Sequence, residues 1–370
     1  MIRILSVFGT RPEAIKMAPV VRALQQAPDR FETLICISAQ HRSMLDQVLE
    51  VFDLEADQDL DLMTPGQSPA DIAARVLERL PPLLRRLRPD VLLVQGDTMT
   101  TFASAFAAYL ERIPSGHVEA GLRTGDRYQP FPEEMNRVLT TRLAAIHFAP
   151  TERARMALLD EGVSPADVHL TGNTVIDALL QTVRPDYCFR SPQLAALDAK
   201  RRLILVTTHR RENFGAPLRG ICAAIRELAT RHPDLQFVLP VHPNPEVKDT
   251  VERLLCDLPG MHLIEPVDYL EFVHLLNRAF LVLTDSGGVQ EEAPSLGKPV
   301  LVLREVTERP EGVEAGTAVV VGTDRERIVR VASELLSSSA AYQRMASAVN
   351  PYGDGLASGR IVAALAERFG

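Results

Sequence analysis

Short runs of uninterrupted apolar residues constrain the fold of this 370-residue chain more than any other feature. Three clear examples lie at residues 91–94, 203–206 and 281–283. A strand that is apolar at every position is buried on both faces, as happens in a parallel sheet covered by helices. Longer stretches with the spacing of amphipathic helices separate these runs. The alternation predicts a doubly wound α/β fold with parallel sheets.

The predicted strands and helices alternate along the whole chain. We expect strands at residues 2–8, 33–38, 90–95, 114–118, 145–148, 202–207, 235–240, 280–284 and 299–303. We expect helices at residues 42–52, 69–88, 98–112, 216–231, 246–257 and 324–337, and a last helix at 356–369.

The alternation restarts once, beyond a polar, proline-bearing stretch at residues 184–192. A chain of this length suits two domains of ~150–190 residues each. We therefore expect two Rossmann-like domains, at residues 1–184 and 192–352, that face a central cleft. Residues 353–370 would add a C-terminal helix after a turn-rich segment.

Charge and apolar content argue against several classes of protein. The net charge of −8 disfavours broad nucleic-acid binding, which needs a basic face. No apolar run approaches the ~20 residues needed to cross a bilayer, so we expect no membrane association. Residues 1–8 have the pattern of a buried strand rather than of a signal peptide, which predicts a cytoplasmic protein.

Cofactor and metal motifs are missing from the sequence. No Gly-x-Gly-x-x-Gly follows an N-terminal strand, and Gly297-Lys298 is followed by Pro299 rather than completing a Walker A motif. The four cysteines are scattered, and the nine histidines lack the spacing of metal ligands. We therefore expect neither a nicotinamide cofactor nor a metal.

Unusual polar residues gather directly after the predicted strands. In open parallel sheets, ligands bind beyond the carboxyl ends of the strands. This rule selects five segments, namely Gly9-Thr10-Arg11, Gly96-Asp97, His117 to Glu119, Thr208-His209-Arg210 and Asp285 to Gly288.

The segment Ser286-Gly287-Gly288 follows a buried strand and opens a predicted helix. Two glycines let backbone N–H groups approach an anion, and the helix dipole favours negative charge there. A tight turn with Ser286 as N-cap would have the same sequence. Glu292 on the same helix would accept both hydroxyls of a ribose, which favours a nucleotide diphosphate as the ligand.

Charged residues at or just after the other predicted strand ends suit acid/base chemistry. Arg11 and Lys16 lie on the first predicted helix, where a cation near the positive end is unfavourable unless an anion binds. Each remaining residue taken alone would more commonly be a cap or a surface charge. Several converging on one cleft would push their pKa values apart, as general acid/base catalysis requires. These residues are Asp97, Glu119, Glu133 and His209.

Together these segments resemble the non-hydrolysing UDP-N-acetylglucosamine 2-epimerases of bacteria. The matching segments run in order over nearly the whole chain. They are Phe8 to Pro19, Ala39 to Arg42, Gly96-Asp97-Thr98, Gly116 to Arg123, Pro132-Glu133-Glu134, His209 to Glu212, Asp285 to Glu292, Thr307 to Glu311 and Asn350 to Gly355.

The resemblance implies a GT-B fold, a homodimer, and a C-terminal helix that crosses back to the first domain. It implies that UDP binds the second domain, with diphosphate on Ser286, Gly287 and Gly288 and ribose on Glu292. Phe272 and the Val267 backbone would hold uracil, and Arg309 would support the site. The sugar end would be lined by Arg11, Lys16, Asp97, Glu119, Glu133 and His209.

Many relatives of this kind bind a second UDP-N-acetylglucosamine as an activator. The residues that match that region are Gln40, His41, Glu134, Arg210 and His242. Ser43 and Gly66 depart from it by replacing larger polar residues. Gln95 and Val267 are further departures, since many relatives carry histidine at the first position and a more polar residue at the second.

The implied reaction is the interconversion of UDP-N-acetylglucosamine and UDP-N-acetylmannosamine. The C2 proton of the sugar is not acidic, so an epimerase without a redox cofactor must expel UDP from C1 and form a 2-acetamidoglucal. Asp97, Glu119 and Glu133 would share the acid/base roles, and Arg11 and His209 would stabilise the departing diphosphate. The alternatives are a GT-B glycosyltransferase, a hydrolysing epimerase and a nucleotide-sugar sensor. We expect the product to serve polysaccharide biosynthesis.

Overall fold

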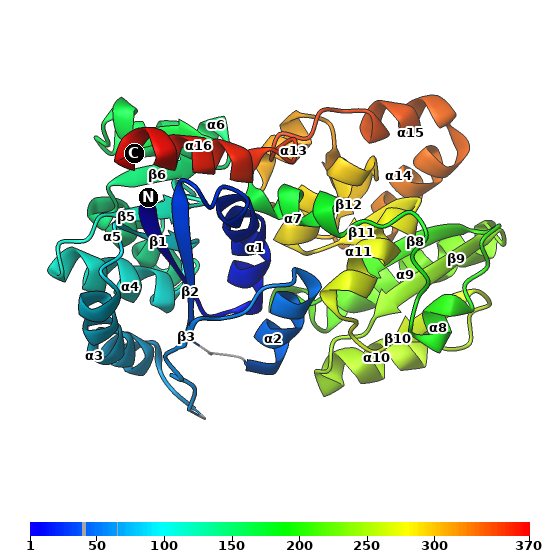
Figure 1. Ribbon diagram of the computed structural model, residues 1–370. Helices are drawn as coiled ribbons and strands as arrows, with labels where there is room; N and C mark the ends of the chain where they lie inside the picture. Colours follow the sequence, from blue (N-terminus) through cyan, green and yellow to red (C-terminus); the bar gives the residue numbers. More distant parts are fainter. Residues whose placement is uncertain (39–41, 65) are drawn as a thin grey trace. The chain divides into compact units, whose positions relative to one another are not determined.

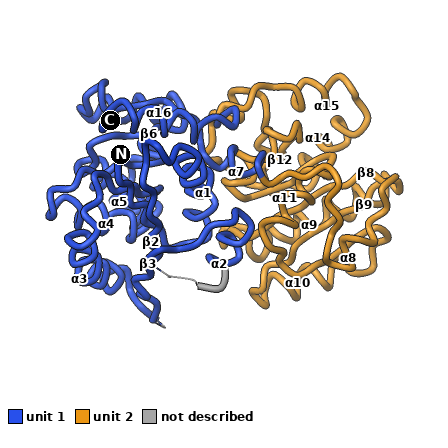
Figure 2. The backbone as a smooth tube through the Cα atoms, in the orientation of Figure 1, with its two compact units in different colours: residues 1–181, 352–370 blue, residues 182–351 orange. Residues whose placement is uncertain are grey.

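The structure is a computed structural model that describes residues 1–38, 42–64 and 66–370. The chain forms two compact units, shown in blue and orange in Figure 2. Unit 1 consists of Met1–Gln181 and Tyr352–Gly370, and unit 2 consists of Thr182–Pro351. Unit 1 is therefore built from two segments that are far apart in the sequence.

Unit 1 contains a seven-stranded sheet in the order β3-β2-β1-β4-β5-β6-β7, with every neighbouring pair parallel. Its strands are β1 (Ile2–Phe8), β2 (Phe31–Ile37), β3 (Gln58–Asp59), β4 (Val91–Gln95), β5 (Ser115–Val118), β6 (Ile146–Ala149) and β7 (Val168–Leu170). Its helices are α1 (Arg11–Gln25), α2 (Arg42–Val51), α3 (Pro69–Leu87), α4 (Met99–Leu110), α5 (Glu133–Leu143), α6 (Glu152–Asp160), α7 (Thr174–Thr182), α16 (Ala357–Phe369) and the 3-10 helix η1 (Pro165–Asp167) (Figure 1).

Unit 2 contains a six-stranded parallel sheet in the order β10-β9-β8-β11-β12-β13. Its strands are β8 (Arg202–Thr207), β9 (Leu235–Pro240), β10 (Met261–Ile264), β11 (Leu281–Thr284), β12 (Val300–Val302) and β13 (Ala318–Val320). Its helices are α8 (Pro192–Ala195), α9 (Ala216–Arg231), α10 (Pro245–Leu255), α11 (Tyr269–Arg278), α12 (Gly287–Glu292), α13 (Pro310–Glu314), α14 (Arg325–Ser337), α15 (Ser339–Ala346) and the 3-10 helices η2 (Arg211–Asn213) and η3 (Ala293–Leu296).

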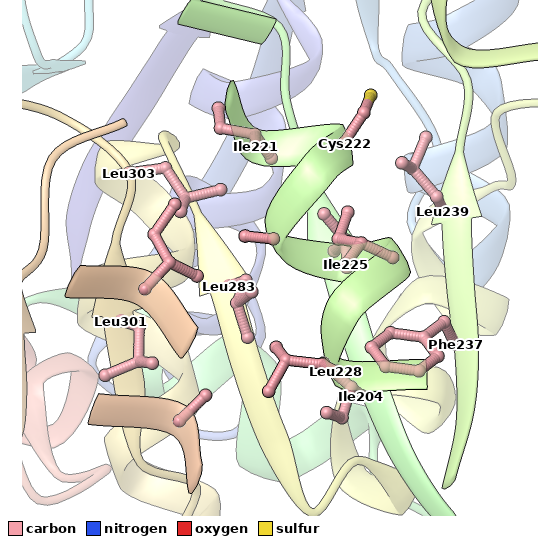
Figure 3. Close-up of a cluster of buried hydrophobic side chains, with 14 of the residues drawn as sticks. Ile204, Ile221, Cys222, Ile225, Leu228, Phe237, Leu239, Leu283, Leu301 and Leu303 are labelled. Carbon is pink, nitrogen blue, oxygen red and sulfur yellow. The ribbon is translucent and has the colours of Figure 1, made fainter. Parts of the chain in front are cut away.

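The apolar strand runs are buried as the sequence predicts. In unit 2, Ile204, Phe237 and Leu283 from three strands pack with Ile225 and Leu228 of α9, and all five are inaccessible to solvent (Figure 3). Strand β4 of unit 1 is buried over its whole length. The doubly wound α/β prediction is confirmed, and each predicted strand ends within two residues of an observed one.

Four observed strands were not predicted, namely β3, β7, β10 and β13. They are the outermost strands of the two sheets. They are only two to four residues long. An edge strand has a neighbour on one side only and needs no long apolar run, so it leaves a weak sequence pattern.

Helix α16 completes unit 1 by packing against α1. Ile361 and Leu365 of α16 are fully buried. The first turn of α16 has no side-chain cap of its own. Instead, the buried Asp177 of α7 accepts hydrogen bonds from the Ala357 and Ser358 N–H groups at 3.2 and 2.8 Å and from Ser358 Oγ at 2.5 Å. A carboxylate on another helix thus caps α16 and holds it to the unit.

Among the described residues, no helix combines the length and the apolar content that crossing a membrane requires.

The cap predicts that Asp177→Ala lowers the free energy of unfolding by about 2–4 kcal/mol, because three buried donors lose their acceptor. Urea denaturation followed by circular dichroism measures the change. Asp354→Ala is the matched control, since Asp354 is an exposed carboxylate that pairs with Arg360 near the start of the same helix. The control is expected to cost less than about 1 kcal/mol. Equal effects of the two substitutions would contradict the capping role.

Candidate active site

Three of the six sugar-end residues of the sequence analysis, Arg11, Asp97 and Glu119, lie at neighbouring strand ends in unit 1. Strands β1, β4 and β5 are adjacent in the sheet and parallel, so their carboxyl ends meet at one edge. Arg11 follows β1, Asp97 follows β4 and Glu119 follows β5 directly. This edge of the sheet therefore brings together one cation and two carboxylates. The first and last of them, Arg11 and Glu119, are more than a hundred residues apart in the sequence.

Glu119 is buried and closely bound. Its carboxylate accepts hydrogen bonds from Lys16 Nζ at 2.6 Å to both oxygens, from Asn173 Nδ2 at 3.1 Å and from Gln95 Nε2. Its backbone has a φ of +63°, which is unusual for a residue with a side chain. Strain of this kind gathers at functional sites, because the surrounding contacts must hold it in place.

Asp97 lies at the neighbouring strand end and is held by Arg137 of α5. Arg137 donates from Nε and Nη2 to Asp97 Oδ2 at 3.0 and 2.7 Å. Glu133 begins the same helix and is partly buried. Within residues 1–38, 42–64 and 66–370, its carboxylate makes no hydrogen bond or ion pair. Of the three predicted acid/base carboxylates, Glu133 is the one with the least engaged oxygens.

Two buried carboxylates near these residues were not recognised as structural from sequence. Glu134, which matches the activator region, accepts N–H groups of Thr124 and Gly125 and Arg137 Nη1, all at about 3 Å. Its oxygens are therefore already occupied within unit 1.

Glu13 of α1 is the second structural carboxylate. It accepts hydrogen bonds from the Gly9 and Thr10 N–H groups at 3.1 and 2.7 Å and from Thr98 and Thr101 Oγ1 at 2.7 and 3.2 Å. Burial raises the pKa of Glu13 above its ordinary value, although these hydrogen bonds oppose the shift. The Thr-x-x-Glu spacing of a capping box was the available signal in the sequence. Glu13 ties the turn after β1 to the turn after β4.

In unit 2, Asp285 plays the corresponding part. It is fully buried and accepts the N–H groups of His209 and Arg210 and Asn213 Nδ2 at 2.9–3.1 Å, and its Oδ1 lies 3.0 Å from His209 Nδ1. Burial raises the pKa of Asp285, but these hydrogen bonds and the His209 ring outweigh it and bring the pKa below its ordinary value. Asp285 thus fixes the turn after β8 and orients the His209 ring.

The Ser286-Gly287-Gly288 turn follows β11 and begins α12. The Ser286 side chain makes no capping hydrogen bond. A Cβ atom placed on Gly287 would lie 3.8 and 3.9 Å from guanidinium nitrogens of Arg309 and Arg210. Two guanidinium groups therefore lie close to a helix start that carries no side chain, and each is also paired with a carboxylate, Arg309 with Glu291 and Arg210 with Glu308. A helix start with nearby guanidinium donors is suited to an anion. Arg210, predicted for the activator region, lies at this turn.

The remaining predicted ligand residues of unit 2 lie outside the Ser286-Gly287-Gly288 turn. Phe272 is in the first turn of α11, and Val267 precedes the N-cap Asp268, after the edge strand β10. Both are partly exposed. Glu292 ends α12 and is buried. His242 follows β9 and accepts the Asn244 N–H at 3.1 Å.

Part of the predicted activator region lies outside the described residues. This holds for Gln40 and His41 and for the side chain of Ser43. Gly66 has a φ of +71° and open space where a side chain would begin. In the part of the chain that the structure describes, no group of three or more His, Cys, Asp or Glu residues has the arrangement of a metal site.

Comparison with known proteins gives consistent matches over both units. The family model described as UDP-N-acetylglucosamine 2-epimerase matches residues 22–366. The UDP-N-acetylglucosamine 2-epimerase of Yersinia pestis is 54% identical over 371 residues, which cover 98% of each chain.

Two solved structures are similar over almost the full length. The UDP-GlcNAc 2-epimerase from Neisseria meningitidis bound to UDP-GlcNAc is 47% identical, covers 99% of this chain and 100% of its own, and has a TM-score of 0.90. The S. aureus MnaA–UDP structure is 46% identical, covers 98% of this chain and 95% of its own, and has a TM-score of 0.88. The two parallel sheets with alternating helices are GT-B-like, and the chain belongs to the UDP-N-acetylglucosamine 2-epimerase family.

Proposed function

We propose that this protein interconverts UDP-N-acetylglucosamine and UDP-N-acetylmannosamine without hydrolysing either. The observation that carries the proposal is the pair of bound carboxylates, Asp97 and Glu119, at adjacent strand ends of unit 1, with the unengaged Glu133 at the start of α5. Such a set suits proton removal and delivery at a sugar carbon. The substrate is suggested by the Neisseria meningitidis relative, whose structure holds UDP-GlcNAc.

In this proposal the turn after β11 binds the diphosphate. Arg210 and Arg309 supply positive charge above Gly287, and the N–H groups of Gly287 and Gly288 supply donors. Glu292 accepts the ribose hydroxyls, while Phe272 and the Val267 backbone contact uracil. Arg11, Lys16 and His209 meet the sugar end, where negative charge develops on the departing UDP.

The chemistry is an elimination followed by a re-addition. The C2–H bond breaks as the C1–O bond to UDP breaks, which leaves a double bond between C1 and C2 and a free UDP. The intermediate is 2-acetamidoglucal. UDP then adds back to C1 while a proton is delivered to the opposite face of C2, so that atoms and charge balance over the cycle.

The contacts favour distinct roles for the three carboxylates. Glu119 is bound by Lys16 and two amides, which suits a group that holds geometry and charge around the sugar. Glu133 has free oxygens, so we assign it the proton that leaves C2. Asp97 keeps Oδ1 free of hydrogen bonds in the described ranges, and we assign it the proton that arrives on the other face.

One experiment separates this function from its alternatives. Purified protein is incubated with UDP-N-acetylglucosamine alone and followed by proton NMR. UDP-N-acetylmannosamine is the expected product. Free N-acetylmannosamine would indicate a hydrolysing epimerase, and an unchanged spectrum would favour an acceptor-dependent glycosyltransferase or a sensor.

We also propose a cytoplasmic homodimer that serves polysaccharide biosynthesis, and light scattering in solution tests its oligomeric state.

The elimination route predicts deuterium at C2 of the product when the reaction runs in deuterated water. The leaving and arriving protons occupy opposite faces, so the original hydrogen is not returned. Mass spectrometry of the product measures the exchange, with protein treated with a chelator and freed of nucleotides. Full retention of the original hydrogen, or activity that depends on added NAD or a divalent metal, would rule out this route.

Binding and chemistry are predicted to separate between the units. Glu119→Gln and Glu133→Gln are expected to bind UDP normally and to lose at least ~10² in turnover. Glu292→Gln is expected to weaken UDP binding by roughly 1.5–3 kcal/mol through the lost ribose hydrogen bonds. Calorimetry with UDP and a turnover assay on the same preparations measure both.

The control for this set is Glu152→Gln, which alters an exposed glutamate of α6 whose one ion-pair partner in the described part of the chain is Arg155. Its binding and turnover are expected to equal those of the unmodified protein. Normal turnover of both Glu119→Gln and Glu133→Gln would place the chemistry elsewhere.

A further inference from the structure

We infer that Arg137 is a positioning residue for the reaction, which fixes one oxygen of Asp97 and leaves the other to act on the sugar. The inference rests on the proposed function, because it assumes that Asp97 is an acid/base group. It concerns a residue that the sequence motifs did not single out. Its basis is a chain of contacts from Glu134 through Arg137 to Asp97.

Both guanidinium donors that reach Asp97 converge on a single oxygen. Arg137 Nε and Nη2 bind Asp97 Oδ2 at 3.0 and 2.7 Å, and no donor binds Oδ1 in the described residues. The Arg137 side chain is only 12% exposed, whereas Asp97 is 29% exposed. The largely buried guanidinium therefore holds Oδ2, and Oδ1 keeps its lone pairs for a ligand.

The backbone beneath Asp97 is fixed as well. The carbonyl oxygens of residues 95–97 each accept a hydrogen bond from a side chain. The donors are Thr101 Oγ1 to Gln95, His117 Nε2 to Gly96 and Asn136 Nδ2 to Asp97, at 2.6, 2.7 and 2.9 Å. Burial lowers the pKa of His117 to about 3, so its neutral ring serves as the N–H donor. With the backbone held, the rotation of the Asp97 side chain is the remaining freedom, and Arg137 removes it.

Arg137 is itself oriented by Glu134, one turn earlier on α5. Glu134 Oε2 accepts Arg137 Nη1 at 3.0 Å, and the same carboxylate binds the Thr124 and Gly125 N–H groups. A guanidinium between two carboxylates in fixed directions behaves as a rigid fork. Asn136 and Arg137, adjacent on α5, hold the backbone and the side chain of Asp97 respectively.

Misplacement of a reacting group by about 1 Å can cost 10²-fold in rate, which sets the expected effect. Arg137→Ala is expected to lower kcat about 10²-fold while KM changes less than about threefold, because UDP binds unit 2. Added guanidinium, well below denaturing concentrations, is expected to raise the kcat of Arg137→Ala at least about tenfold. Asp97→Asn is expected to lose turnover without any rescue.

Two further variants make the test decisive. Arg137→Lys keeps the charge but cannot place two donors of one rigid plane on Asp97 Oδ2, and about a tenfold loss of kcat is expected. Arg142→Ala is the matched control on the same helix, since the Arg142 side chain is exposed and, among the residues that the structure describes, binds only the Glu161 carbonyl, at 2.8 Å. Its kcat is expected to match the unmodified protein.

The outcomes separate this inference from the proposed function. If the unmodified protein forms no UDP-N-acetylmannosamine, the proposed function fails. If it does, full kcat in Arg137→Lys or absence of rescue in a folded Arg137→Ala overturns the positioning role. Should Arg137→Ala not fold, the kcat of Arg137→Lys against Arg142→Ala decides.

Discussion

In each unit a buried carboxylate ties together the turns beyond the strand ends, and the geometry of the candidate site depends on it. Glu13 does this in unit 1 and Asp285 in unit 2. A buried carboxylate is costly unless several donors satisfy its oxygens. Because each carboxylate takes donors from a turn other than its own, the hydrogen bonds that satisfy its charge also fix the two turns relative to each other. The strand ends can then carry strained or exposed polar groups such as Glu119 and His209 without losing their positions.

The carboxylates of unit 1 divide by how many of their oxygens are occupied. Glu13 and Glu134 are saturated by backbone and side-chain donors, so they define shape. Asp97 is held through one oxygen, and Glu133 is not held at all among the residues that the structure describes. A carboxylate that exchanges protons with a substrate needs an oxygen with an accessible lone pair. A carboxylate that positions its neighbours is held in place best when hydrogen bonds occupy both of its oxygens. The two kinds of glutamate stand side by side at residues 133 and 134.

Sequence reasoning recovered the features that have a local pattern. Buried central strands have apolar runs in the sequence, so they were predicted. Short edge strands such as β7 were missed, because a strand with a neighbour on one side only needs no such run. The strand-end residues followed from the rule for parallel sheets. The difference between Glu133 and Glu134 could not be predicted, since it depends on which side of α5 meets the loop at residues 124–125. Arg137 was missed for the same reason, although its spacing from Glu134 allowed a contact one turn away.

The two-segment construction of unit 1 has a consequence for how the chain is made. Asp177 leaves the ribosome about 180 residues before the N–H groups that it caps. During that interval the face of α1 that α16 will cover is exposed, and the second unit is synthesised and free to fold meanwhile. Closing so long a loop is an entropic cost that local contacts cannot offset early. Unit 1 therefore finishes last although it is translated first, and a nascent chain halted before residue 352 would display an incomplete N-terminal unit to chaperones and proteases.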